Sequence, residues 1–394
     1  MTIKKNPFPT SRRRLSWYDP TLRSWFYQGV ILAVVGFIVW YLVSNTLHNL
    51  SVRNISSGFG FLHREAGFAI GESAIAYTPA DTYGRAIVVG LLNTLKVSVV
   101  GIVAATLFGT ILGIARLSKN WLVARVAGVY VEIVRNIPLL LQLFFWYAII
   151  TASTPGPRQA LHPLPGVFLS NRGLKLPTLH GEAVDWIVVA LGLAIVAVIV
   201  LGHWVRKRQD ATGRLLPFGR IATLVLIGLP LLGWLFSGAS VAIDMPYLKG
   251  FNFTGGMTIS PEFAALLTGL VLYTSAFVAE VVRSGIGSVD RGQWEAASSL
   301  GLSRARMLRL VILPQALRVI VPPMTSQYLN LTKNSSLAIA VGYPDIVSVV
   351  NTTLNQTGQA IEGILIIMAV YLAVSLSISL LMNWYNQRIA LVER

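Results

Sequence analysis

The sequence predicts an all-α membrane protein, a polytopic bundle of about eight transmembrane helices. Of its 394 residues, 54% are hydrophobic and 12% are charged, and this charged share is about half that of an ordinary soluble domain. The apolar residues fall in blocks of about 20, the length that crosses roughly 30 Å of hydrocarbon. Because the blocks are continuous rather than alternating, and because every backbone polar group in lipid must be paired within its own element, helices are expected rather than strands.

The apolar blocks follow one another along the whole chain. They lie at 26–44, 88–115, 126–150, 184–203, 218–236, 262–283, 321–343 and 361–385. The first block follows a basic tail, residues 1–25, and this arrangement is shared with signal peptides. Because Asn and His flank the block rather than a small-residue cleavage site, we expect a retained first span and an outer loop that together cover residues 26–87.

The basic residues lie between the apolar blocks, so the net charge of +16 does not indicate nucleic-acid binding on one soluble face. With the N-terminus inside, 22 of the 32 Lys and Arg residues fall in inward-facing segments, seven in outward-facing segments and three within spans. The positive-inside rule therefore predicts that both termini are cytoplasmic. The chain has no cysteine, and its five histidines are scattered, so we expect no disulfide, no metal site and no cysteine nucleophile.

The segment 290–323 is predicted to form a cytoplasmic loop with structure of its own. Residues 293–300 are mostly good helix formers, and Gly301 follows where a helix end favours a residue that tolerates a left-handed backbone. Ser303 can cap a second, amphipathic helix, and Pro314 should bend or end that helix. The result would be a short helix, a sharp turn and a second helix on the membrane surface, which suits the docking of a partner.

These residues also carry a resemblance. Glu295-Ala296-Ala297, then Gly301, then Val311-Ile312-Leu313-Pro314 resembles the EAA signature of permease subunits of ATP-binding-cassette importers, in the branch that carries polar and general L-amino acids. The signature usually has Ile where Val311 stands. The resemblance implies that the loop couples the chain to a separate ATPase through Glu295, Ala296, Ala297, Gly301, Leu302, Arg304, Leu313 and Pro314. The chain has no GxxxxGK[ST] phosphate loop, so ATP and Mg would be bound by that partner and no cofactor is expected here.

Four other segments, 90–95, 131–142, 277–283 and 333–337, resemble the spans of the same family. Together they imply a five-helix type I importer core within residues 88–390, interrupted by an insertion, residues 151–260, with two extra helices. Enlarged permeases of this kind are known from broad-specificity L-amino-acid importers of proteobacteria. The resemblance thus implies a bacterial inner-membrane location, with a second homologous permease, two copies of an ATPase and a periplasmic amino-acid-binding protein as partners.

Uncharged polar residues inside apolar blocks are the candidates for substrate binding. Asn334, Ser335 and Ser336 lie in the seventh block, where hydroxyl and amide groups could bind both ends of an amino-acid zwitterion. Thr274, Ser275 and Gln142 are further candidates on the same reasoning. The alternative is that these groups bond to their own helix backbone or across a helix interface.

Two ExxR pairs also lie within the spans, Glu132 with Arg135 and Glu280 with Arg283, each on one helical face. They could gate the cytoplasmic mouth of the pathway, or form fixed salt bridges that hold helices together. Small residues at Gly101, Ala105, Gly109 and Gly113 form a ridge that could bring another helix close.

Two kinds of transporter fit these features. The first is the importer permease described above. The second is an ion-gradient-driven secondary transporter or channel, for which duplicated halves are expected and are not visible in the sequence. No nucleophile and base with a recognisable spacing is present, so no catalytic residue and no enzyme activity are expected.

Overall fold

The structure is a computed structural model that describes residues 20–52, 58–213, 216–238 and 242–389. Most of the basic tail predicted over 1–25 lies outside these residues. The long helices are α1 (Pro20–Val52), α2 (Tyr83–Arg116), α3 (Trp121–Asn136), α4 (Leu139–Ser153), α5 (Glu182–Thr212), α6 (Phe218–Ser237), α7 (Pro261–Gly287), α10 (Leu313–Asn334), α11 (Ile346–Thr357) and α12 (Ala360–Ile389). The short ones are η1 (Phe59–His63), η2 (Pro157–Gln159), α8 (Arg291–Ser299), α9 (Arg304–Met307), η3 (Leu308–Ile312) and η4 (Ser335–Val341).

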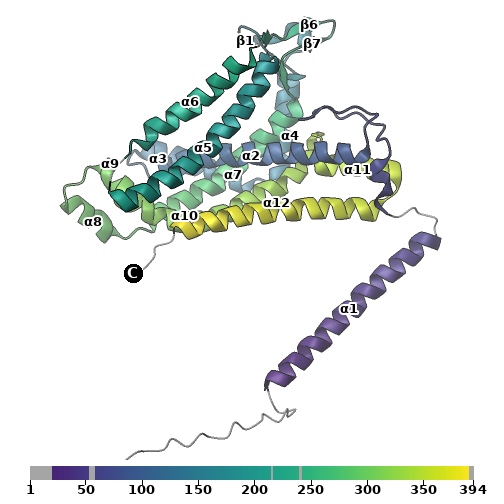
Figure 1. The fold of residues 1–394 in the computed structure, drawn as a ribbon, viewed down its shortest axis with the longest axis horizontal. Coiled ribbons are helices and arrows are strands. Elements are labelled where there is room, and N and C mark those ends of the chain that lie inside the picture. Colours follow the sequence, from purple (N-terminus) through teal and green to yellow (C-terminus); the bar gives the residue numbers. More distant parts are fainter. Residues whose placement is uncertain (1–19, 53–57, 214–215, 239–241, 390–394) are drawn as a thin grey trace, which may run out of the picture.

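The predicted helical membrane fold is confirmed. Within the described residues, seven helices are long and apolar enough to cross a membrane, or eight if the bent pair of α3 and α4 counts as one span. In Figure 1, α8 and α9 lie at one end of the bundle and α11 at the other. The apolar window of α1 is not buried at all, and α1 stands apart from the other helices in Figure 1.

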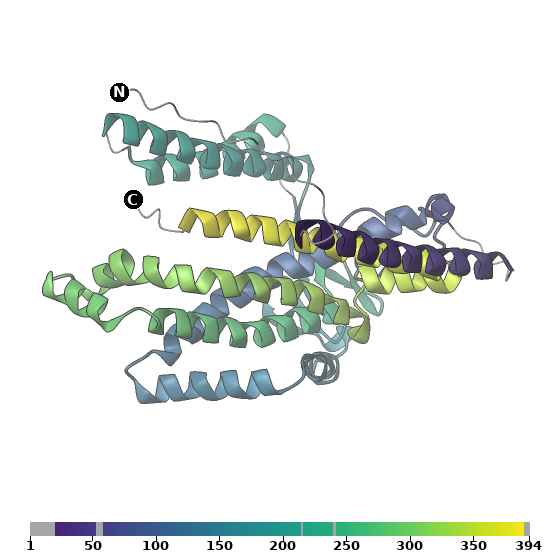
Figure 2. The same ribbon diagram turned by 90° about the horizontal axis from the view of Figure 1, so that it is seen from below.

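The third apolar block, 126–150, differs from the single helix predicted. The helical path is interrupted between α3 and α4, and the two helices meet at an angle of 106°. In Figure 2, α3 lies across the view whereas α4 is seen along its axis. Pro138 explains the break, because it lacks an N–H and restricts the residue before it to an extended backbone. Ile137 has that extended conformation, with φ −96° and ψ 128°.

Helix α7 is the centre of the bundle and packs against α2, α3, α4 and α10. The small-residue ridge on α2 brings α2 close to α7, as predicted: a Cβ atom added to Gly109 would lie 2.5 Å from Cβ of Val278, and one added to Gly113 would lie 2.8 Å from the carbonyl oxygen of Ala279. Gly101, further along the ridge, faces Leu331 of α10 and, at a greater distance, Leu267 of α7. Small side chains thus set the spacing of the core helices.

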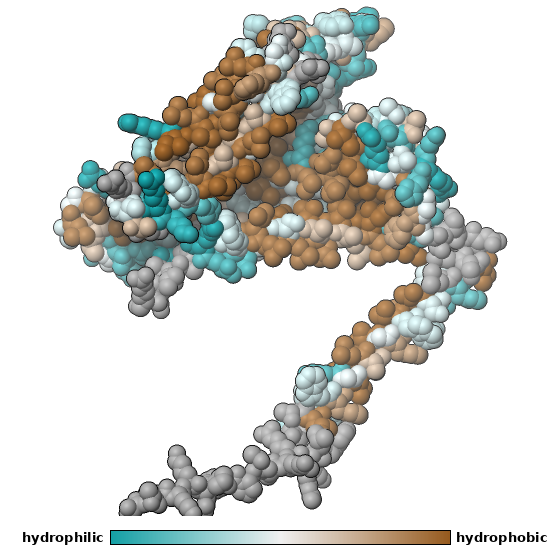
Figure 3. Space-filling model, viewed as in Figure 1, coloured by the Kyte–Doolittle hydropathy of each residue, from teal (hydrophilic) through white to brown (hydrophobic). Residues whose placement is uncertain are grey.

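The segment 151–260 adds the hairpin of α5 and α6, whose surface is almost wholly exposed and apolar (Figure 3). Short strands join the hairpin to the core: β1 (Leu161–Leu164), β2 (Val167–Ser170), β3 (Gly173–Leu176), β4 (Thr178–His180), β5 (Ala242–Asp244), β6 (Tyr247–Lys249), β7 (Asn252–Thr254) and β8 (Met257–Ile259). Strands β1, β2, β3 and β8 form one antiparallel sheet in that order, with Leu174 opposite Ile259. This pairing ties the start of the insertion to the residues just before α7.

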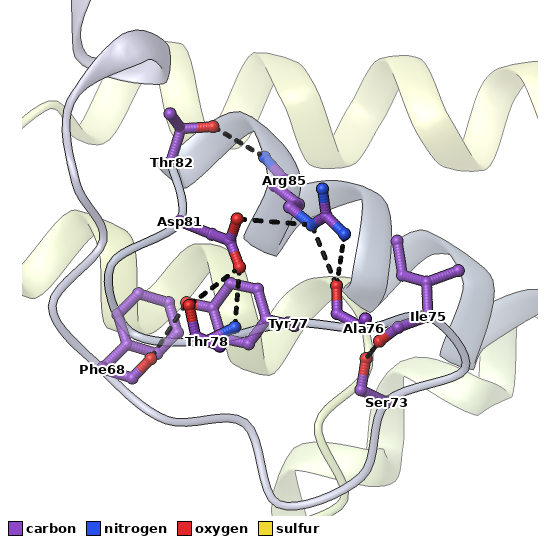
Figure 4. A network of polar contacts seen from close by, with 9 residues as sticks. All are labelled: Phe68, Ser73, Ile75, Ala76, Tyr77, Thr78, Asp81, Thr82 and Arg85. Carbon is purple, nitrogen blue, oxygen red and sulfur yellow. Dashed lines mark hydrogen bonds and ion pairs between the residues drawn. The ribbon is translucent and has the colours of Figure 1, made fainter.

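A second non-helical region, the loop before α2, is held by its own hydrogen bonds (Figure 4). Arg85 donates from Nε to the carbonyl oxygen of Ala76 at 3.0 Å, and the Tyr77 hydroxyl donates to the carbonyl oxygen of Phe68 at 2.9 Å. The backbone N–H of Thr78 donates to Asp81 at 2.7 Å and holds the pKa of that carboxyl below its usual value. These hydrogen bonds therefore fix the conformation of the loop, which lies at the end of the bundle opposite α8.

Candidate functional site

The predicted helix, turn and helix of segment 290–323 are present. Asp290 caps α8, since its Oδ1 accepts the N–H of Gly292 at 2.6 Å. Gly301 has φ 68°, its N–H donates to the carbonyl oxygen of Ser298 at 2.9 Å, and the N–H of Leu302 donates to Ala297 at 3.4 Å. This pair of bonds is the Schellman arrangement, which satisfies the last carbonyls of a helix and turns the chain sharply. We call residues 290–307 the elbow.

The coupling residues predicted from the sequence are mostly on the surface of this elbow. Glu295, Ala296, Gly301 and Arg304 are exposed, as are Leu313 and Pro314 at the start of α10. Ala297 is buried and Leu302 half-buried, so these two support the elbow from inside. Glu295 lies in the middle of α8, whereas Asp290 stabilises the N-terminal end of that helix.

Leu300, at the tip of the elbow, is a residue that the sequence analysis missed. Its side chain is 79% exposed, beside the turn at Gly301. A single exposed leucine is common on protein surfaces. At the end of a short polar helix, it leaves one large apolar side chain open at the surface beside a tight turn.

The elbow is joined to a membrane span without interruption. Helix α9 continues through η3, a π-helical turn in which the N–H of Leu313 donates to the carbonyl oxygen of Leu308, into α10. Pro314 was expected to bend or end this helix. It lies instead in the first turn of α10, directly after the π-helical turn η3. A helix tolerates proline in its first turn, so the missing N–H of Pro314 does not interrupt the helical path from α9 to α10. Residues Arg304–Val341 together satisfy the length and hydropathy of one span.

The predicted substrate residues of the seventh block lie at the far end of that span. Helix α10 ends at Asn334, which is half-buried, and Ser335 and Ser336 begin η4. The hydroxyl of Ser335 donates to the carbonyl oxygen of Thr332 and that of Ser336 to Lys333, both at 2.7 Å. Both hydroxyls therefore donate to the backbone of their own helix, and the role of these residues in substrate binding stays a prediction.

The other three candidates lie around α3, α4 and α7. Gln142 donates from Nε2 to the carbonyl oxygens of Val134 and Ile137 at 2.9 and 3.0 Å, so it satisfies the backbone at the break between α3 and α4. Ser275 donates to the carbonyl oxygen of Leu272 at 2.8 Å, and its hydroxyl lies 3.2 Å from that of Tyr130. Thr274 is 4% exposed. All three side chains are thus buried within the bundle, and their role in substrate binding stays a prediction.

Asp345 is a buried polar residue that the sequence analysis did not single out. Its side chain is 0% exposed, and its Oδ1 accepts the N–H of Ser348 at 2.9 Å as the cap of α11. The hydroxyl of Tyr371 lies beside this carboxyl and the hydroxyls of Ser335 and Ser336. Burial raises the pKa of Asp345 to about 7. A signal was available, since Asp is among the residues preferred at a helix N-cap.

The two ExxR pairs have different surroundings. Glu280 binds Arg116 and Arg283, and Nη1 of Arg135 lies 4.0 Å from it. Among the described residues no ion pair joins Glu132 to Arg135, and Glu132 is exposed. Glu280 therefore links three helices, α2, α3 and α7, and Arg116 is the partner that the sequence analysis missed.

At the opposite end of the bundle, a cavity of about 400 Å³ lies between the loop before α2, the start of α7 and α11. Glu72 and Glu262 contribute carboxylates to its lining. Glu72 pairs with Lys96 at 2.5 Å and accepts the hydroxyl of Ser260 at 2.6 Å. The cavity thus has two carboxylates in its lining and lies at the end of the bundle opposite the elbow.

Known proteins resemble this chain over most of its length. The family model described as "Binding-protein-dependent transport system inner membrane component" matches residues 101–391. A putative amino-acid ABC transporter permease protein, YhdX of Escherichia coli, is 54% identical over 98% of both chains. The general L-amino acid transport system permease protein AapQ of Rhizobium johnstonii is 49% identical over 97% of this chain and 96% of its own.

Two further likenesses are weaker. The glutamate/glutamine/aspartate/asparagine transport system permease protein BztB of Rhodobacter capsulatus is 43% identical over the whole of both chains. A crystal structure of an amino acid ABC transporter with histidines covers 78% of this chain and 95% of that chain, at 23% identity and a TM-score of 0.46. On the family match and the near full-length relatives, the chain belongs to the family of inner membrane components of binding-protein-dependent transport systems, which are transport subunits and not enzymes.

Proposed function

We propose that the chain is the permease subunit of an ATP-driven importer that moves L-amino acids of several kinds across the inner membrane. The substrate class is supported by the names of the relatives, one of which is a general L-amino acid permease and another a permease for two acidic amino acids and their amides. The excess of Lys and Arg in the segments that would face inward supports cytoplasmic termini.

The observation that carries the coupling proposal is the unbroken path from the elbow into α10. A separate ATPase that grips Glu295, Leu300 and the turn at Gly301 would move α9, η3 and α10 together, because no loop intervenes between them. Closure of two ATPase copies would then move a membrane span as a rigid body. ATP and Mg would stay in the ATPases, and a second permease and a periplasmic binding protein would complete the assembly.

The test is uptake into proteoliposomes that contain the whole complex. Labelled acidic, neutral and basic L-amino acids are supplied outside with the binding protein, and either ATP is enclosed or an ion gradient is imposed. We expect uptake of all three kinds with ATP and none with a gradient alone. Uptake driven by the gradient would instead identify a secondary transporter.

The elbow itself is tested with a matched pair of glycine variants. Gly301 and Gly358 both have positive φ, 68° and 73°, follow a helix C-terminus, and have open space where a Cβ would lie. Valine at either position costs about 1 to 3 kcal/mol of backbone strain. Gly301→Val should abolish the stimulation of ATPase activity by loaded binding protein, whereas Gly358→Val should keep it. Equal loss in both variants would show that only stability was lost, and would contradict the proposal.

A further inference from the structure

A groove of about 960 Å³ lies where the inner ends of α2, α3 and α7 meet the elbow and η3. Four basic residues line it: Lys119 between α2 and α3, Arg291 at the start of α8, Arg304 in α9 and Arg309 in η3. All four are exposed, and the described residues that line the groove include no acidic side chain. The groove is therefore a concentrated positive surface.

The floor of the same groove is apolar. Ile114, Val123, Leu308 and Leu313 line it with side chains that are 55%, 44%, 37% and 44% exposed, and Trp294 lies among them half-buried. Apolar side chains open to the surroundings beneath a rim of cations fit an amphiphile, with an anionic head and a hydrocarbon body. Neither a free anion nor a polar peptide would cover this floor.

The groove is distinct from the tip of the elbow. Glu295, Leu300 and Gly301 do not line it, whereas residues from the inner ends of three membrane helices do. Basic pockets between membrane helices on the cytoplasmic side are suited to phospholipid head groups, because the surrounding leaflet carries anionic lipid. Figure 3 shows hydrophilic and hydrophobic residues side by side at this end of the bundle.

We propose that this groove binds one anionic phospholipid of the cytoplasmic leaflet, with its phosphate among Lys119, Arg304 and Arg309 and its acyl chain over Ile114 and Leu308. The lipid would join the inner ends of α2 and α3 to η3, and so brace the elbow against the membrane. The assignment to the cytoplasmic leaflet rests on the proposed function, whereas the anionic lipid itself follows from the groove.

The test uses the purified whole complex, stripped of lipid in detergent and titrated with dioleoyl phosphatidylglycerol, dioleoyl phosphatidylcholine or inorganic phosphate, with bound molecules counted by native mass spectrometry. The groove variant is Lys119→Gln with Arg309→Gln. The matched control is Arg125→Gln with Arg306→Gln, which removes the same charge from α3 and α9 at exposed residues that do not line the groove.

We expect the groove variant to bind phosphatidylglycerol on the order of thirtyfold more weakly at one site per copy of the chain, since two cations near an anionic head group are lost. The control should bind like the unaltered complex, phosphatidylcholine should bind weakly, and inorganic phosphate should not compete. Equal binding by both variants, or competition by inorganic phosphate, overturns the proposal. Loss of the ATPase subunits from the groove variant with unchanged lipid binding also overturns it, because the groove would then dock protein.

This outcome is separable from that of the proposed function. Lipid counting requires no transport, so uptake driven by an ion gradient would refute the coupling to ATP and leave the lipid site standing. Uptake driven by ATP together with unchanged lipid binding would refute the lipid site alone.

Discussion

Replacing Gly109 with alanine should push α2 and α7 apart. The added Cβ would lie 2.5 Å from Cβ of Val278 and 2.7 Å from the carbonyl oxygen of Ser275, whereas ordinary contacts begin near 3.4 Å. Val278 is 0% exposed, and the oxygen belongs to the backbone of the central helix, so neither can yield alone. The two helices would have to separate by about 1 Å, which also opens the packing on either side.

The size of the effect follows from two opposed contributions. Overpacking in a dense core costs about 1 to 3 kcal/mol, and this site lies toward the upper end because one of the clashing atoms is backbone. Alanine in a helix interior is favoured over glycine by about 1 kcal/mol. We therefore expect Gly109→Ala to lower the free energy of unfolding by about 1 to 2 kcal/mol.

The measurement is a denaturant titration of the purified complex, with the shift in midpoint converted through a common slope. Gly128→Ala in α3 is the matched control, because it makes the same change in a helix with no other atom within 4 Å of the new Cβ. It should be neutral or up to about 1 kcal/mol more stable. If Gly109→Ala proved as stable as Gly128→Ala, the close approach of α2 and α7 would not contribute to the stability of the fold.

Three further substitutions test buried polar groups by the same titration. Glu280→Gln leaves the three arginines without their carboxylate and should lower the free energy of unfolding by about 1 to 3 kcal/mol. The control Glu132→Gln should change that free energy little. Equal effects of the two substitutions would contradict the role of Glu280 as a link between helices. Gln142→Leu leaves two carbonyls at the break between α3 and α4 unsatisfied and should cost about 1 to 3 kcal/mol, and an unchanged midpoint would show that water satisfies them. For Asp345, the native pKa of about 7 lies above the unfolded value near 4. Between these values the folded state holds a proton that the unfolded state releases, so the free energy of unfolding should fall as pH rises from about 4 to about 7. Asp345→Asn should flatten the profile between about pH 4 and about pH 7, and an unchanged slope would assign the pH dependence to another group.

The features that the sequence predicted correctly are those set by neighbours along the chain. Hydropathy located the apolar spans, the four-residue spacing of small residues located the face of α2 that meets α7, and Gly301 located the turn of the elbow. The break before Pro138 was visible as a proline but was hidden within an apolar run. Helix α11 was missed because it is short and only partly apolar.

The contacts that define the polar interior were not predictable, because they join distant parts of the chain. Arg116 meets Glu280 across 164 positions, and nothing in either local sequence distinguishes this pairing from that of Glu132 with Arg135. The hydroxyls of Ser335 and Ser336 had two acceptable sets of partners, their own backbone or a ligand. The backbone conformation at the end of α10 places a carbonyl within reach of each hydroxyl, and local sequence does not specify that conformation.

The packing around α10 indicates which helices would move with the elbow. Its first turns, at Ala316 and Ile320, pack in one cluster with Val278 and Val282 of α7, and α7 in turn is tied through Glu280 to α2 and α3. Pro322 and Pro323 follow in the middle of α10, where each removes a helical hydrogen bond and makes bending easier. A force on the elbow would therefore move the inner halves of these helices as one block, and the proline pair is where the outer half of α10, with Asn334 at its end, can change its angle to that block.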